Sequence, residues 1–305
     1  MGVPPVSAWL ALGVLLFAAP LVPGVAARTK AIFAGRRGAP VWQLYADLWK
    51  LAQRGIVYST AITWVFRLAP VALVATTITA AALLPLDGHG GLIAFSGDAV
   101  AFVCLLALGR FALVLAALDT GSSFEGMGAS RDATFATLIE PGLFIALAAL
   151  AIAADSYSLT SMLGARSAAG TADAPALVLI AASIFALMLA ECARVPVDDP
   201  ATHLELTMVH EVMILDHSGP DLAMVLYAQA LKLATFAAII LGVLLPPRSS
   251  GGWVAPFALL ASLVFIGVAV GIVESVMARL RLPRVPLFIA AGGSVALFGL
   301  ILVLR

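Results

Sequence analysis

Eight runs of predominantly apolar residues, each long enough to cross a lipid bilayer as a helix, dominate this chain of 305 residues. Apolar residues make up 62% of the sequence, which is more than the core of a soluble protein requires. We therefore expect an all-α membrane protein with about eight transmembrane helices. The expected spans lie at residues 6–27, 60–84, 98–118, 133–154, 174–193, 222–246, 253–276 and 285–304.

The distribution of basic residues predicts how these spans are oriented. Arginine and lysine concentrate in the loops after the odd-numbered spans, whereas the opposite side holds only Arg166, Arg248 and Arg305. The positive-inside rule places the basic loops in the cytoplasm, so that both termini lie on the outer side. We expect one polytopic domain, 1–305, with cytoplasmic loops at 28–59 and 191–221. The formal net charge is zero, which argues against a nucleic-acid partner.

The loop at 28–59 contains a predicted amphipathic helix. Apolar side chains recur at the spacing of one helical face, at Val41, Leu44, Tyr45, Leu48 and Trp49. We expect this helix to lie in the membrane interface, where the basic residues of the loop attract anionic lipid. In the alternative interpretation, Arg36 and Arg37 stand on a glycine-bounded turn and dock a peripheral protein.

Ionisable residues inside the apolar spans are a second unusual feature. Glu140 precedes a proline in the fourth span, and proline there removes a helical hydrogen bond and can kink the helix. Ser130 is expected to cap this span at its N-terminus. The candidate partners of Glu140 are Arg110 in the third span and Lys232 in the sixth, and Glu274 falls in the seventh span. Because charge is costly in lipid, these groups predict a polar or proton path; ion pairs that only fix helix packing are the alternative.

The loop at 191–221 is the most charged segment, with seven of the 17 carboxylates and three of the four histidines. Glu191 and Arg194 are one helical turn apart and are expected to pair. Five further carboxylates have no basic neighbour within the loop: Asp198, Asp199, Glu205, Glu211 and Asp216. Such a concentration indicates solvent, a basic partner surface or a proton-collecting mouth.

The histidines of this loop, His203, His210 and His217, recur every seven residues. At 1.5 Å rise per residue, neighbours on one helix lie about 10 Å apart, too far to share a zinc ion bound at ~2.1 Å. We therefore expect no metal site, and interpret the histidines as members of a polar helix face that are available for hydrogen bonds or for proton exchange near neutral pH. Residues 199–200 are expected to begin this helix and 219–220 to end it.

At these residues the chain resembles the H subunit of complex I and, more closely, its relatives in the membrane-bound nickel–iron hydrogenases, such as those of formate hydrogenlyase and hydrogenase-4. The resemblance extends over essentially the whole chain. It is carried by residues 35–38 with 40 and 43–50, by 128–131 with 140–141, by 191–198, and by the hydrogenase-type segment 199–221.

The resemblance implies a subunit without redox centres that lies beneath the peripheral arm of an oxidoreductase complex and couples electron transfer to proton or sodium translocation. Iron–sulfur clusters and a nickel–iron centre would belong to an iron–sulfur small subunit and a hydrogenase large subunit, with antiporter-like subunits alongside in the membrane. A quinone-site-forming H-type subunit of a complex I enzyme is the alternative, although His203 stands where that pattern has an acidic residue. A separate transporter and a purely structural anchor are further alternatives.

We expect no catalytic residue and no bound cofactor in this chain. The residues expected to form the charged path are Glu140, Glu191, Arg194, Asp198, Asp199, Glu205, Glu211, Asp216, Lys232, Arg110 and Glu274. The residues expected to dock partner subunits are Arg36, Arg37, Arg131, His203 and His210.

Overall fold

The computed structural model describes residues 5–88, 90–164, 174–198, 208–245 and 254–305, and these residues form helices and no β-strand. Seven helices are long and apolar enough to cross a membrane, and a bent helix pair at the N-terminus adds an eighth crossing. The expected all-α membrane fold with about eight spans is therefore confirmed. The long helices are α4 (Trp64–Ala82), α5 (Asp98–Asp119), α6 (Ser123–Ala154), α8 (Ala174–Glu191), α10 (Gly219–Leu244), α11 (Val254–Val276) and α12 (Val285–Val303).

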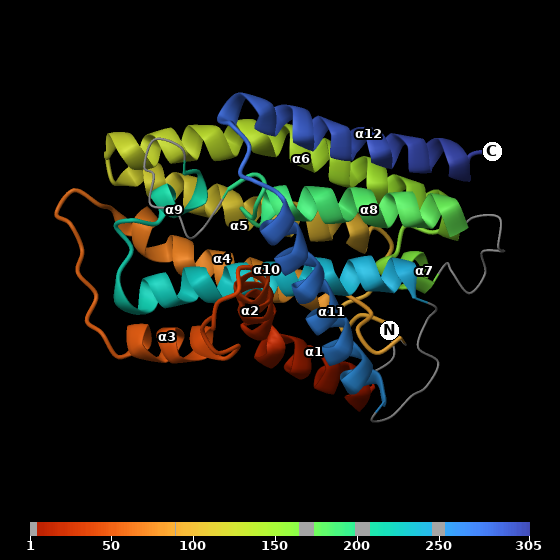
Figure 1. Cartoon of the computed structure of the whole chain (residues 1–305), viewed down its shortest axis with the longest axis horizontal. Helices are drawn as coiled ribbons and strands as arrows, with labels where there is room; N and C mark the ends of the chain where they lie inside the picture. Colours follow the sequence, from red (N-terminus) through yellow and green to blue (C-terminus); the bar gives the residue numbers. More distant parts are fainter. Residues whose placement is uncertain (1–4, 89, 165–173, 199–207, 246–253) are drawn as a thin grey trace.

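Helix α10 is central to the bundle and packs against α4, α8 and α11 (Figure 1). Helices α4 and α5 form one adjacent pair, while α6, α8 and α12 pack on one another. The first helix begins, and α12 finishes, toward the same end of the bundle, as an even number of crossings requires (Figure 1). Three short elements join the long helices: α7 (Leu159–Gly164), α9 (His210–Met213) and the 3-10 turn Leu282–Arg284.

The first span is a bent pair, α1 (Val6–Ala18) and α2 (Leu21–Phe33), which meet at 44°. Pro20 has no N–H group with which to bond the carbonyl oxygen of Leu16 four residues earlier. That oxygen accepts instead from the hydroxyl of Tyr227 in α10 at 3.0 Å, and the hydroxyl of Tyr45 donates to the next carbonyl oxygen, that of Phe17. Two side chains from other helices thus satisfy the backbone at the break.

The predicted amphipathic helix is present as α3 (Gln43–Ala52), which packs along α10 and α2. Its two tryptophans, Trp42 just before it and Trp49 within it, are 67% and 68% exposed. They are seven residues apart and therefore lie on one face. Exposed tryptophan beside an amphipathic helix is typical of the boundary between lipid and water.

Three helix boundaries differ from the expected ones, the first of them at α2, which continues to Phe33 instead of ending at residue 27. Helix α6 begins ten residues before residue 133, so that Ser130 lies inside it and donates its hydroxyl to the carbonyl oxygen of Met127 at 3.0 Å instead of capping it. Gly219 and Pro220 begin α10 and do not end a helix, because Gly219 adopts a φ of +55° and proline suits the first helical turn. Pro141 lies within α6 without ending it.

Candidate functional site: a buried charge network

Four helices bring charged side chains together inside the bundle. The guanidinium group of Arg110 on α5 forms ion pairs with Glu191 at the end of α8 and, at 3.2 Å, with Glu140 on α6. Lys232 Nζ on α10 lies 3.1 Å from Glu191 Oε1. The Glu191 side chain is only 1% exposed. Glu140 is thus paired with Arg110, one of its two predicted partners, and four residues predicted for the charged path form one connected network, in which Glu191 contacts both bases.

Asp132 also belongs to this network, although it was not among the residues predicted for the charged path. Its carboxylate interacts electrostatically with Arg110, Glu191, Lys232 and Glu140. Its Oδ2 atom is buried and has no hydrogen-bond partner among the described residues. The network then holds three acids and two bases, so that it carries a charge of −1 when all five are ionised. A buried excess charge is costly unless a proton or water compensates for it.

A second cluster lies where α8 ends. Glu274 on α11 pairs with Arg194 at 3.3 Å and approaches Lys30 at 3.9 Å. The predicted pair of Glu191 with Arg194 is wrong, because α8 ends at Glu191 and the chain then turns through Ala193, whose φ is +47°. The turn directs the two side chains to different partners.

Asp198 fixes the described part of the acidic loop. One carboxylate oxygen lies 2.7 Å from the guanidinium of Arg279, and the other accepts from the backbone N–H groups of Val209 at 3.0 Å and His210 at 3.3 Å. In the sequence, Asp198 has no basic neighbour within the loop, and its base is instead Arg279 from the segment after α11. The predicted site residues Asp199, Glu205 and His203, and the expected helix start at 199–200, lie outside the described residues.

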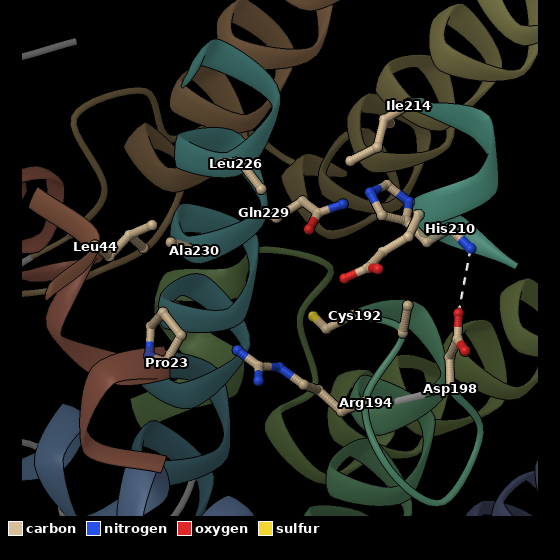
Figure 2. Close-up of a pocket in the computed structure, with 12 residues that line it drawn as sticks. Pro23, Leu44, Cys192, Arg194, Asp198, His210, Ile214, Leu226, Gln229 and Ala230 are labelled. Atoms are coloured by element: carbon tan, nitrogen blue, oxygen red, sulfur yellow. Dashed lines mark hydrogen bonds between the residues drawn. The ribbon is translucent and has the colours of Figure 1, made fainter. Parts of the chain in front are cut away.

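A cavity of about 240 Å³ opens beside these clusters, between α2, α3, α10 and the acidic loop (Figure 2). Arg194, Cys192, Gln229 and His210 surround it in Figure 2. Burial raises the pKa of the Cys192 thiol to about 12 and lowers the pKa of His210 to about 3. Both side chains are therefore neutral near pH 7, and the charge around the cavity comes from its acids and arginine. Glu211 also contributes to its wall.

The two histidines among the described residues, His210 and His217, do not lie on one polar helix face as the sequence suggested, and His203 lies outside the described residues. His210 begins the single turn α9 and has a buried Nε2 atom without a hydrogen-bond partner among the described residues. His217 is 3% exposed and stacks on Phe66, with 4.1 Å between ring centroids. Burial lowers its pKa as well. In the described part of the chain, no group of histidine, cysteine, aspartate and glutamate could hold a metal ion.

Comparison with known proteins decides the family. A family model described as NADH dehydrogenase matches residues 6–304. The chain belongs to this family. It is 33% identical to hydrogenase-4 component C of Escherichia coli K12 over 233 residues, which are 76% of this chain and 73% of that protein. It is 32% identical to formate hydrogenlyase subunit 4 of the same organism over 286 residues, or 92% of each chain.

Two more distant matches agree with this result. The H subunit of NADH-quinone oxidoreductase from Burkholderia ambifaria is 25% identical over 73% of this chain and 63% of its own length. A chain of the membrane-bound sulfane sulfur reductase, an archaeal respiratory membrane complex, shares the fold with a TM-score of 0.84, 19% identity and 98% coverage of both chains. The resemblance inferred from the sequence is confirmed: the chain is a multi-pass membrane subunit of the hydrogenase and complex I-like type.

The arginines predicted for docking partner subunits differ from one another in exposure and contacts. Arg36 and Arg37 are exposed on the turn after Gly35, whose φ is +66°. Arg131 donates instead to the carbonyl oxygen of Met208 at 3.0 Å and so holds the acidic loop against α6. Their roles in docking stay predictions.

Glu125, which sequence analysis did not single out, supports the same loop from within. It is 1% exposed and accepts from the backbone N–H of the exposed Asp216 at 3.0 Å. Glu125 lies in the first turn of α6, where the helix dipole favours a carboxylate. That preference is the only feature of the sequence that could have pointed to this residue.

Proposed function

We propose that the chain is the membrane-anchor and coupling subunit of a membrane-bound nickel–iron hydrogenase complex. It docks the electron-transfer arm and links redox chemistry to proton or sodium translocation. Support comes from the two relatives above 30% identity, which are hydrogenase-4 component C and formate hydrogenlyase subunit 4. Iron–sulfur clusters and the nickel–iron centre would be held by partner subunits, over the loops that bear Arg36, Arg37 and the acidic segment.

The observation that carries the coupling role is the shared position of Glu191. Its carboxylate is buried between Arg110 and Lys232, and Arg110 also holds Glu140. Glu191 is the last residue of α8 and directly precedes the turn into the acidic loop. A change in loop position would therefore move Glu191 relative to its two bases. A carboxylate that loses contact with a base takes up a proton more readily. The other groups of the network then change their affinity for protons as well, since interacting ionisable groups titrate together.

Two further ion pairs connect the acidic loop to the rest of the bundle. Arg194 and Asp198 both lie on the cavity wall. Arg194 is paired with Glu274 on α11, and Asp198 with Arg279 just after that helix. A partner subunit that binds over the acidic loop would contact the segment that these pairs fix. Docking and ion movement would thus act on the same stretch of chain.

The test compares ion movement with electron transfer in the whole complex. Glu140→Gln should leave the complex assembled and hydrogenase activity measurable in inverted membrane vesicles, while the proton or sodium gradient per turnover falls about a hundredfold, the lower end of the effect that one proton-transfer group typically contributes. Asp47→Asn on α3, outside the network, is the control for expression and assembly. Full gradients in both Glu140→Gln and Glu191→Gln would contradict the coupling role.

A second candidate function, quinone binding by an H-type subunit, is favoured by the cavity between α2, α3 and α10. Its wall mixes apolar residues such as Pro23 and Leu44 with Gln229 and His210, as a quinone ring with two carbonyl oxygens would need. Leu44→Trp should then abolish quinone-dependent turnover and leave electron transfer to an artificial acceptor intact. Equal activity of Leu44→Trp with quinone would exclude this candidate.

A further inference from the structure

An apolar groove of about 470 Å³ lies at the end of the bundle that is remote from the acidic loop. It is formed by the start of α5, the last three turns of α6 and α7, which lies at the opposite end from α9 in Figure 1. None of the residues of the charge network contributes to it. The groove is therefore separate from the site described above.

The walls of the groove are apolar and open outward from the bundle. Val100 is 53% exposed, Ile152 47% and Phe144 38%, and Ala148 is exposed between them. Leu147 closes the inner side and is buried. On the outside of a transmembrane bundle, such a surface is in contact with lipid or with another apolar chain.

The length of the groove matches one leaflet of the membrane. Along α6 it runs from Phe144 to Asp155, which at 1.5 Å per residue is roughly 16 Å. This is about half of the ~30 Å hydrocarbon core. A partner helix that crosses the membrane would need a contact surface over the whole core, whereas an acyl chain reaches only to the middle.

The rim of the groove is polar and acidic. Asp155, Ser156 and Tyr157 stand at its mouth, where Tyr157 is 71% exposed and Asp155 is also exposed. No basic residue is among the described residues that line the groove. Asp155 would repel an anionic headgroup and attract an ammonium group, and tyrosine is common at this level of a membrane.

We propose that this groove binds one acyl chain of a phospholipid whose ammonium headgroup, that of phosphatidylethanolamine, contacts Asp155 at the rim. The apolar walls hold the chain and the carboxylate selects the headgroup. A primary ammonium donates hydrogen bonds to the carboxylate, which the trimethylammonium group of phosphatidylcholine cannot do.

The experiment measures lipids retained by the intact membrane complex after exchange in nanodiscs of equal parts phosphatidylethanolamine, phosphatidylcholine and phosphatidylglycerol, by native mass spectrometry. Ala148→Trp fills the groove and should remove the retained lipid. Ala291→Trp, at an exposed alanine of α12, adds the same side chain elsewhere and should retain it.

Asp155→Asn tests headgroup selection without disturbing the backbone, because asparagine tolerates the φ of +48° at this position. The preference for phosphatidylethanolamine should fall roughly threefold, the effect of one exposed ion pair, while the groove stays occupied. Equal lipid retention in Ala148→Trp and Ala291→Trp, preferential retention of phosphatidylglycerol, or cross-linking of a photoreactive residue at position 148 to a partner subunit instead of lipid would each overturn the proposal.

Discussion

Lys232 Nζ donates to both Oε1 and the main-chain carbonyl oxygen of Glu191, at 3.1 Å each. Glu191 is the last residue of α8, so the ammonium group also faces the negative end of that helix dipole. One lysine from α10 thus neutralises a buried carboxylate and completes a helix terminus. This double contact provides hydrogen-bond acceptors for a lysine side chain within an apolar span.

We predict that Lys232→Met lowers the free energy of unfolding by about 3 kcal/mol, because it leaves the Glu191 carboxylate with Arg110 alone in a buried position. The double variant Lys232→Met/Glu191→Gln should lose less than the sum of the two single variants. Thermal unfolding in detergent measures both quantities. Lys50→Met on the exposed side of α3 is the control, and strictly additive losses would show that the two residues are not coupled.

A separate prediction concerns Asp198, whose carboxylate joins Arg279 to the backbone of α9. Asp198→Ala should speed hydrogen exchange at the amides of Val209 and His210 by about ten- to a hundredfold, since a hydrogen bond to a charged group contributes roughly 1.5–3 kcal/mol. Asp198→Asn keeps an acceptor oxygen and should have a smaller effect. Unchanged exchange in Asp198→Ala would mean that other contacts hold this segment.

The long helices could be predicted from the sequence because each depends on a local property, a run of apolar side chains, that lipid requires wherever the helices pack. The residue at which α6 begins could not be predicted in this way. Gly126 and Gly128 are poor helix formers, but Gly128 lies where an added Cβ would come within 2.9 Å of the carbonyl oxygen of Val209. Its lack of a side chain serves close packing against the segment at α9, which only the folded chain reveals.

The charge network illustrates the same limit for the candidate site. Its members were recognised individually because charge within an apolar span is unusual. The pairing of Glu140 with Arg110 was predicted, but the partners of Glu191 were not, since Arg110 and Glu191 are 81 positions apart and the positive φ of Ala193 turns Arg194 away from its sequence neighbour. Asp132 was missed because a carboxylate near an expected helix start has a local explanation that concealed the long-range one.

Stability should depend on pH through His210. Burial lowers its pKa from 6.5 to about 3, so the unfolded chain binds a proton in this range that the folded protein excludes. Stability is then lost as the pH falls from 6.5 toward 3, by about 1.4 kcal/mol per pH unit, and does not depend on this group above 6.5. Unfolding midpoints in detergent between pH 7.5 and 4.5 measure the slope.

His210→Gln should flatten that profile. His217, whose pKa is also lowered by burial, contributes a slope of its own, so His210→Gln/His217→Gln should be the flattest of the series. If the single variant kept the full slope of the native protein, His210 would not be the neutral buried group that the structure places beside the cavity.

The contact between α2 and α11 depends on Gly271. A Cβ atom there would lie 2.6 Å from Cβ of Thr29 and 2.7 Å from the carbonyl oxygen of Ala26, so Gly271→Ala must push the two helices apart. We expect a loss of about 1–3 kcal/mol in unfolding free energy. Glu274, one turn further along α11, should then hold Lys30 and Arg194 less closely.

Gly13 in α1 provides the matched control, because nothing lies within 4 Å of a Cβ added there. Gly13→Ala should be neutral or stabilise the helix by up to about 1 kcal/mol, as alanine is the better helix former. Thermal unfolding of both variants in one detergent separates a packing effect from the general effect of replacing glycine. Similar midpoints for the two variants would show that α2 and α11 do not approach as closely as this, and would also weaken the assignment of Glu274 to the second charged cluster.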